Sequence, residues 1–174
     1  MDERTIDEAV SAWVALVEAH SAAMDAVEAE MTAVAGLPLS WHEVLVRLSR
    51  AEQGSMRMQE LARAVLLSKS GLSRLADRME AAELIERSSC GADRRGIYAV
   101  ITAAGREALE RARPVFLEAV ERHFAAHLDG SELATLERSL RKVSRGEGIG
   151  AEEQCATTDL TERAPEPASA ATVA

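Results

Sequence analysis

The sequence predicts a mainly α-helical fold with one short β-hairpin near its middle. Of the 174 residues, 47% are hydrophobic but only 3% are aromatic, and alanine, leucine and valine dominate the apolar set. This balance favours helices over strands. Apolar residues recur every three or four positions through most of residues 5–144, which is the period of an amphipathic helix. We therefore expect a succession of amphipathic helices around one core.

The first expected helix is long and covers residues 5–35. Gly36, Leu37 and Pro38 follow it, and glycine and proline are typical of a helix end. The apolar positions of this helix are Ile6, Val10, Trp13, Val17, Met24, Val27, Met31 and Val34.

A second, shorter helix is expected to begin at Ser40. Serine is a favourable N-cap, and Glu43 stands three residues later, as a capping box requires. Gln53 and Gly54 end this helix. Its expected buried face consists of Trp41, Val44, Leu45 and Leu48.

Residues 58–101 predict two further short helices and then a hairpin. Ser68 is expected to cap the second of these helices. Strands at residues 84–88 and 97–101 flank a polar loop with a glycine near each end, which is the pattern of a hairpin with a long tip. Two short helices followed by a hairpin describe a winged helix-turn-helix. The apolar positions of the two helices are Met58, Leu61, Ala62 and Val65, then Leu72, Leu75 and Met79.

The C-terminal part predicts a second long helix, from Thr102 to about His127, and a last helix from Ser131 to Ser144. Pro114 should kink or break the long helix. The remaining residues have no aromatic side chain and little periodicity, so we expect a disordered tail. The long terminal helices carry more apolar surface than the small middle unit can cover, so a second copy of the chain is expected to cover it. The expected division is residues 1–35 and 107–145 for dimerisation, 36–106 for the winged helix-turn-helix and 146–174 for the tail.

Charge is distributed unevenly along the chain. The formal net charge is −9, yet residues 55–106 contain nine basic and six acidic residues, which gives +3. The rest of the chain contains eleven basic and twenty-three acidic residues, which gives −12. DNA binding requires a local basic surface and not a basic protein, so this distribution is compatible with it.

The outward face of the helix capped by Ser68 predicts contacts with DNA. The second helix of a helix-turn-helix pair fits the major groove, and Gly71 would let its backbone come close. Serines and backbone amides near a helix start suit phosphate oxygens, and arginine can bind guanine or phosphate. A solvated surface face is the alternative for such residues taken alone. The candidate DNA-binding residues of this helix are Ser68, Lys69, Ser70, Ser73, Arg74 and Arg78.

The tip of the hairpin adds a second candidate contact. Arg94 and Arg95 are placed to enter the adjacent minor groove, where the potential is negative. Asp93 cannot favour DNA by its charge, so its expected role is to orient a neighbouring arginine by a charge-assisted hydrogen bond.

Two segments carry a resemblance to a known family. They are "MQELARAVLLSKSGLSRLADRMEAAELIER" and "DRRGIYAVITAAGREAL". They resemble the MarR (multiple antibiotic resistance regulator) family of transcriptional regulators, whose D-x-R pattern falls on Asp93 and Arg95. The T-x-x-G pattern that opens the next helix falls on Thr102 and Gly105. The resemblance covers about residues 5–145 and omits the tail.

The resemblance implies properties that the residues alone do not show. Members are homodimers whose terminal helices form the interface, and their two winged domains bind a pseudopalindromic operator. Many are repressors that small phenolic or anionic effectors release. By this resemblance the recognition helix covers about residues 68–81, and Arg95 is the minor-groove residue.

An effector pocket is expected near four residues, although each has a second explanation. The tryptophans also suit a core or a dimer interface, and capping would explain the glutamate. In urate-responsive members an acid and two arginines, at about the positions of Glu43, Arg74 and Arg87, take part in the response; both arginines also have DNA-binding or structural explanations. The candidate pocket residues are Trp13, Trp41, His42 and Glu43.

The remaining reactive residue types do not complete a catalytic or metal site. Cys90 lies near the hairpin tip, where an exposed thiolate could be oxidised, but the peroxide-sensing members have their reactive cysteine in the first helix and this chain has none there. Cys155 lies in the tail. His123 and His127 are four residues apart, but no further ligand completes a metal site, so a solvated pair is expected. No metal and no cofactor is expected.

The sequence therefore predicts a sequence-specific DNA-binding transcriptional regulator, and the family resemblance implies a ligand-responsive repressor that binds a pseudopalindromic operator as a homodimer. It predicts no enzyme, because no nucleophile–base pair, metal cluster or phosphate loop is present. It predicts a cytoplasmic protein without a membrane partner, because no apolar run reaches the roughly 20 residues of a span and the N-terminus is acidic. The alternative is a helical dimer that serves as a protein-interaction module without specific DNA binding.

Overall fold

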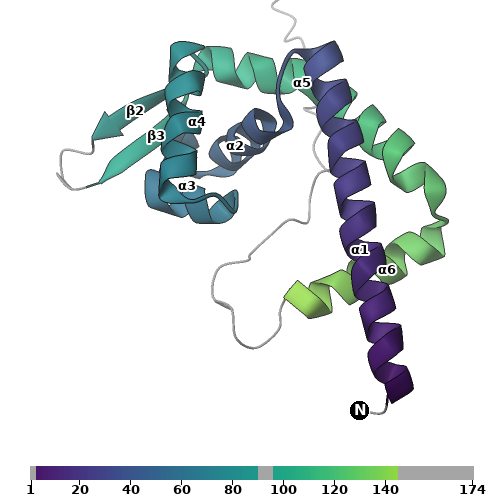
Figure 1. Cartoon of the computed structure of the whole chain (residues 1–174). Coiled ribbons are helices and arrows are strands. Elements are labelled where there is room, and N and C mark those ends of the chain that lie inside the picture. The colour runs from purple at the N-terminus through teal and green to yellow at the C-terminus, as the bar shows by residue number, and fades with distance from the viewer. Residues whose placement is uncertain (1–2, 90–95, 145–174) are drawn as a thin grey trace, which may run out of the picture. The chain divides into compact units, whose positions relative to one another are not determined.

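The computed structural model describes residues 3–89 and 96–144. The chain divides into two compact units, Met1–Asp129 and Gly130–Ala174. The first unit contains all the strands and all but one of the described helices (Figure 1), and the described part of the second unit is the helix α6, Gly130–Ser144. The fold is mainly α-helical with one small antiparallel sheet, as the sequence predicts.

The first long helix forms over nearly the predicted range. It consists of α1, Glu3–Glu30, and a wider π-helical turn, η1, Met31–Ala35. Gly36 ends it in the left-handed conformation with φ 62°, which glycine adopts without a steric penalty. Of the predicted apolar positions, Val27 and Met31 are buried within the chain, whereas the others are exposed.

The helix α2, Leu39–Arg50, begins one residue before the predicted cap, so the capping box at Ser40 and Glu43 is wrong. Pro38 occupies the N-cap position and supplies no side-chain hydrogen bond. The carboxylate of Glu28 in α1 accepts a hydrogen bond of 2.6 Å from the backbone N–H of Leu39. A carboxylate is favourable there because a helix N-terminus carries a partial positive charge.

The winged region follows α2 and a short 3₁₀ helix, η2, Glu52–Gly54. It contains β1, Ser55–Arg57; α3, Met58–Ala64; α4, Lys69–Ala81; β2, Ile85–Ser89; and β3, Ile97–Ile101. The sheet has the antiparallel order β1-β3-β2. The hairpin β2–β3 is as predicted to within one residue, but the sequence prediction missed β1, which pairs Ser55 with Val100. Three residues are too few to show the alternation of apolar and polar side chains that indicates a strand in a sequence.

One hydrophobic core holds the winged region together. Side chains from α2, α3, α4 and the sheet meet there, and Leu45, Leu61, Leu72, Met79 and Ile85 are almost completely buried. Such close packing fixes the direction in which the opposite, polar face of α4 points.

The helix α5, Ala103–His123, starts where the T-x-x-G pattern predicts. Thr102 is its N-cap: the hydroxyl accepts from the Gly105 N–H at 2.9 Å and donates to the Glu83 carbonyl at 2.7 Å. A Cβ on Gly105 would lie 2.1 Å from the carbonyl oxygen of Leu84, so only glycine fits this close approach.

Pro114 lies inside α5 and does not break it, although Figure 1 shows the helix changing direction along its length. The α-helix ends before the predicted His127, and a 3₁₀ turn, η3, Ala125–His127, follows it. Near this end Glu30 of α1 binds Arg122 at 2.5 Å and His123 at 2.9 Å. The hydrogen bond from His123, with Arg122 beside it, lowers the pKa of Glu30.

The helix α6 starts at Gly130, one residue before the predicted Ser131, and ends at Ser144 as predicted. Within α6, Arg141 binds Glu137 at 2.8 Å, one turn earlier in the helix. The predicted tail, residues 146–174, lies outside the described residues. Among the described helices, none combines the length and the apolar character that crossing a bilayer requires.

Candidate nucleic-acid interface

The start of α4 is held by a serine cap, as the sequence predicts. The Ser68 hydroxyl oxygen accepts a hydrogen bond of 3.0 Å from the backbone N–H of Gly71. The hydroxyls of Ser68 and Ser70 lie 3.2 Å apart. This cap fixes the first turn of the helix, where free backbone amides and serine hydroxyls suit phosphate oxygens.

The two sides of α4 differ in chemistry. One side is buried against the core and carries Leu72, Leu75, Ala76 and Met79. The other side and the N-cap are exposed to solvent and carry small hydroxyls and long cations. The structure thus brings six sequence-predicted residues together at one end and on one side of α4: Ser68, Lys69, Ser70, Ser73, Arg74 and Arg78.

The wing contributes its two strands to the described structure. Ser89 and Ile97 pair at the outer end of the hairpin β2–β3. The predicted tip residues Asp93, Arg94 and Arg95 lie outside the described residues, and so does Cys90. At β1, the Arg57 Nε donates to the Tyr98 hydroxyl at 2.8 Å, and its guanidinium lies 5.4 Å from the centre of the Tyr98 ring.

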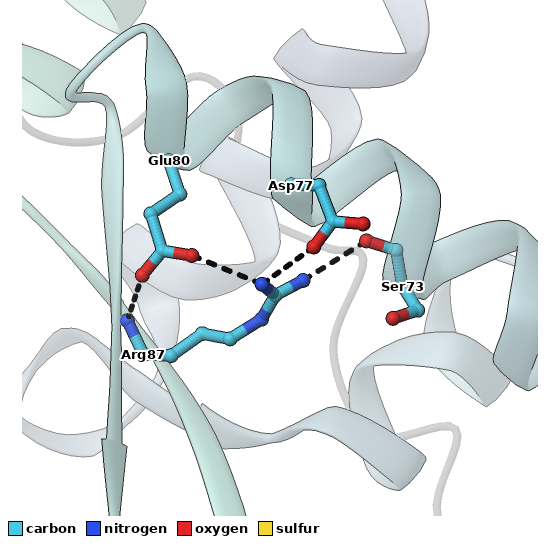
Figure 2. A network of polar contacts seen from close by, with 4 residues as sticks. All are labelled: Ser73, Asp77, Glu80 and Arg87. Carbon is cyan, nitrogen blue, oxygen red and sulfur yellow. Dashed lines mark hydrogen bonds and ion pairs between the residues drawn. The ribbon is translucent and has the colours of Figure 1, made fainter.

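A polar network joins α4 to β2 (Figure 2). Arg87 Nη1 lies 2.6 Å from Asp77 Oδ1 and 2.9 Å from Glu80 Oε2, and Nη2 donates to the Ser73 carbonyl at 2.9 Å. The Arg87 backbone N–H also donates to Glu80 Oε1 at 3.1 Å. The sequence leaves three readings for Arg87, namely effector response, DNA binding and a structural role, and these contacts support the structural one. The sequence analysis did not predict this network. Asp77 and Glu80, on one side of the expected helix, followed by Arg87 in the expected strand, form a pattern that could have indicated it.

Three of the four candidate pocket residues lie together on α2. His42 is buried and its ring stacks on Phe116 of α5, with ring centres 4.5 Å apart; burial lowers the pKa of His42. Trp41 is half-buried against the core, and Glu43 lies 4.0 Å from Arg47 on the next turn. Trp13 is 65% exposed on α1. Met31, at the end of the same long helix, belongs to the core against which Trp41 packs. The helical rise places Trp13 about 27 Å along the axis from Met31, so Trp13 lies far from Trp41, His42 and Glu43 within one chain.

The predicted histidine pair does not act together. His123 binds Glu30, whereas His127 is exposed in η3. Within residues 3–89 and 96–144, no group of three or more histidine, cysteine or acidic side chains has the geometry of a metal site.

Two short helices, the second with a polar outward face, packed beside a three-stranded antiparallel sheet define a winged helix-turn-helix protein. A sequence profile of the MarR family matches residues 35–96. AbsC, a MarR family transcriptional regulator from Streptomyces coelicolor, is 36% identical, with a TM-score of 0.72 over 78% of this chain and 90% of AbsC. The chain therefore belongs to the MarR family, whose members are transcriptional regulators.

Two further solved structures illustrate the likeness. Sco3205, a MarR family regulator from Streptomyces coelicolor solved in complex with DNA, is 29% identical, with a TM-score of 0.74 over 80% of this chain and 90% of that one. BpsR from Bordetella bronchiseptica is 22% identical, with a TM-score of 0.68 over 77% of this chain and 98% of that one, and shows the shared fold. No curated protein matches the chain.

Proposed function

We propose that this protein is a ligand-responsive transcriptional repressor that binds a pseudopalindromic operator as a homodimer in the cytoplasm. The observation that carries the proposal is the exposed polar side of α4, where small hydroxyls and cations gather above a buried apolar side. A helix of this kind suits the major groove because it can approach closely and offer donors to bases and phosphates. The DNA complex of Sco3205 supports this role for a related protein.

The residues of α4 divide into two expected roles. Ser70, Ser73 and Arg74 are proposed to contact base edges, because they lie on the first two turns of the exposed side. Ser68, Lys69 and Arg78 are proposed to contact phosphates, which fix the register of the helix but carry no sequence information. Arg94 and Arg95 are proposed minor-groove contacts, with Asp93 orienting a neighbouring arginine.

A homodimer is proposed because α1 presents an apolar stripe that the described part of the chain leaves exposed. A second copy would bury this stripe and place two copies of α4 on one duplex, which a two-fold symmetric operator requires. The exposed residues of the stripe include Ile6, Val10, Trp13, Val17 and Met24.

A small phenolic or anionic effector is proposed to control binding from the region around Trp41, His42 and Glu43. These residues lie on α2, which packs against α5, and His42 stacks on Phe116 at that contact. The structure of BpsR bears on the regulation of its DNA binding by 6-hydroxynicotinic acid, which is a small molecule of this chemical kind. An effector acts only if it prefers one spacing of the two recognition helices to another. Trp13 could join such a site only from a partner subunit.

The first experiment is fluorescence anisotropy with the DNA upstream of the protein's own gene, repeated at several salt concentrations. The expected result is tight binding that a scrambled duplex does not reproduce and that weakens steeply with salt. Weak binding that ignores sequence, for this DNA and for sites selected from random duplexes, would contradict the proposal. It would instead favour a helical dimer that acts as a protein-interaction module.

The matched variants are Ser73→Ala with Arg74→Ala on α4, and Glu107→Gln with Arg111→Gln on α5. The α4 pair should lose operator binding, whereas the α5 pair, which lies outside the winged region, should bind as wild type does.

A further inference from the structure

We infer that Arg87 is a positioning residue for DNA binding: from strand β2 it holds α4 at a fixed rotation relative to the wing. This inference rests on the proposed function of α4 as the recognition helix. It concerns a residue that does not itself face the groove, and it assigns a role to the network in Figure 2.

The contacts of Arg87 with Ser73, Asp77 and Glu80, called the clamp below, are spread along α4. The three acceptors on α4, from Ser73, Asp77 and Glu80, follow one another by four and three residues and so occupy one stripe along two helical turns. Contacts at one point would leave the helix free to rotate about its axis, whereas contacts spread along a stripe resist rotation. Arginine suits this task because its guanidinium presents donors in a rigid, planar fork.

Both Nη atoms of the Arg87 guanidinium contact protein acceptors. Nη1 serves both carboxylates, Nη2 serves the Ser73 carbonyl, and the backbone N–H of the same residue serves Glu80. The side chain is only 24% exposed. A phosphate or base contact through either Nη atom would have to compete with these acceptors, which distinguishes Arg87 from the exposed cations of α4.

Ser73 links the clamp to the proposed interface. Its carbonyl accepts from Arg87, while its side chain lies on the exposed side among the proposed base contacts. A shift of α4 at this residue would therefore move a base-contacting side chain directly. Because direct readout depends on hydrogen-bond geometry, small shifts reduce the discrimination between sequences.

The clamp is expected to affect specificity more than stability. Asp77 is 58% exposed and Glu80 is 40% exposed, and ion pairs at such solvated sites contribute little to folding. The apolar side of α4 keeps the helix folded against the core without the clamp. Replacement of Arg87 should therefore weaken operator binding clearly while changing the midpoint of unfolding little.

The variants must distinguish the effect of Arg87 on the position of α4 from its effect on charge, because Arg87 also neutralises two carboxylates close to the proposed DNA surface. Arg87→Gln removes the clamp and leaves both carboxylates charged. The triple variant Asp77→Asn, Glu80→Gln, Arg87→Gln removes the clamp and both negative charges together. Arg87→Lys keeps the charge but replaces the fork with one ammonium. Arg111→Gln is the control, because Arg111 pairs only loosely with Glu107, at 3.9 Å, on α5 outside the winged region.

The experiment measures the dissociation constants of the full-length protein for its operator and for a scrambled duplex, over a salt series, beside thermal unfolding. For the triple variant we expect about tenfold weaker operator binding, which corresponds to losing about one good base contact. Its binding to scrambled DNA, its salt slope and its midpoint of unfolding should stay near the wild-type values. The operator affinity of Arg87→Lys should lie between those of wild type and the triple variant, and the operator affinity of Arg111→Gln should match that of wild type.

Several outcomes would overturn the inference. Wild-type operator affinity in the triple variant would show that Arg87 acts by charge alone. A salt slope that falls by about one in Arg87→Gln but stays at the wild-type value in Arg87→Lys would show a direct phosphate contact, because lysine keeps the positive charge. Losses that track the midpoint of unfolding across all variants would show a merely structural role. A wild-type protein without any sequence preference would overturn the proposed function itself, and that result is read from the wild-type titration alone.

Discussion

The winged region and the helix α1 differ in how far their apolar residues are buried within the chain. In the winged region, Leu61, Leu72 and Ile85 are enclosed by neighbours from the same chain. In α1 the same helical period produces a stripe of which Val27 and Met31 are buried, whereas positions such as Val10 and Trp13 remain exposed. The core of the winged region is thus formed within one chain, whereas the exposed stripe on α1 is proposed to pack against a second copy. Two predictions test this difference directly, and three smaller ones test single features of α1 and of the winged region.

The largest effect is expected in the core of the winged region. Leu61→Ala should lower the free energy of unfolding by about 3 kcal/mol, because it removes buried methyl groups and leaves a cavity. Chemical denaturation measures this change. The control is Ile97→Ala, at an exposed position in the same region, which should change stability by less than about 0.5 kcal/mol. Equal losses at both positions would contradict the idea of a self-contained core.

On α1 the corresponding change should act on association. Trp13→Glu should weaken self-association about thirtyfold or more, because a tryptophan at the centre of an interface commonly contributes about 2 kcal/mol or more. Light scattering after gel filtration, at several protein concentrations, measures the dimer fraction. Ala15→Glu introduces the same charge on the opposite side of α1 and should leave the dimer intact. If both variants dimerise as wild type does, the stripe is not the interface.

A smaller effect is expected where α1 supports α2. Glu28→Ala should cost about 1 kcal/mol of stability, because the N–H of Leu39 at the start of α2 loses its acceptor. Glu28→Gln keeps an acceptor oxygen of similar reach and should retain most of this stability. Thermal unfolding of the two variants side by side would show whether the cap comes from this side chain.

The contact between α1 and α5 should depend on pH. Because the pKa of Glu30 is lowered in the folded state, its contribution is present above the ordinary carboxyl pKa and is lost as pH falls through the lowered value. Wild type should therefore unfold at a higher temperature than Glu30→Gln at pH 7, and the difference should shrink by about pH 3. A difference that is the same at both pH values would exclude the Glu30 carboxylate as its source.

The smallest effect is expected at the turn between α3 and α4. Leu66 has a φ of 54°, in the left-handed region, and its side chain is 91% exposed. Leu66→Gly removes the strain of this conformation, and the greater freedom of the unfolded glycine chain offsets part of the gain. The net stabilisation should be about 0.5 kcal/mol. Leu66→Ala keeps a Cβ in the strained conformation and should not show this gain.

Much of the fold could be predicted from the sequence because the signals are local. The helical period located the long helices, and Ser68 and Thr102 marked helix starts that the structure confirms. The same period separated the buried side of α4 from its polar side, so the candidate residues on α4 follow from spacing alone. The role of those residues in DNA binding stays a prediction.

The failures have a different physical origin. The capping box at Ser40 was wrong because Glu28, eleven residues before Leu39, supplies the acceptor from another helix. The strand β1 was missed because its three residues become a strand only by pairing with β3, more than forty residues later. Neither partner lies within the window over which a sequence pattern can be read.

By itself, the sequence determined the helical periods, the serine and threonine caps and the polar side of α4, because residues up to four positions apart set these features. Only the tertiary structure decided which apolar stripes are covered within the chain, which carboxylate caps α2 and what Arg87 binds. The contact of Arg87 with the Ser73 carbonyl spans fourteen residues and joins a strand to a helix. Such contacts exist only after the core has packed, because the core sets the distance and rotation at which two elements meet.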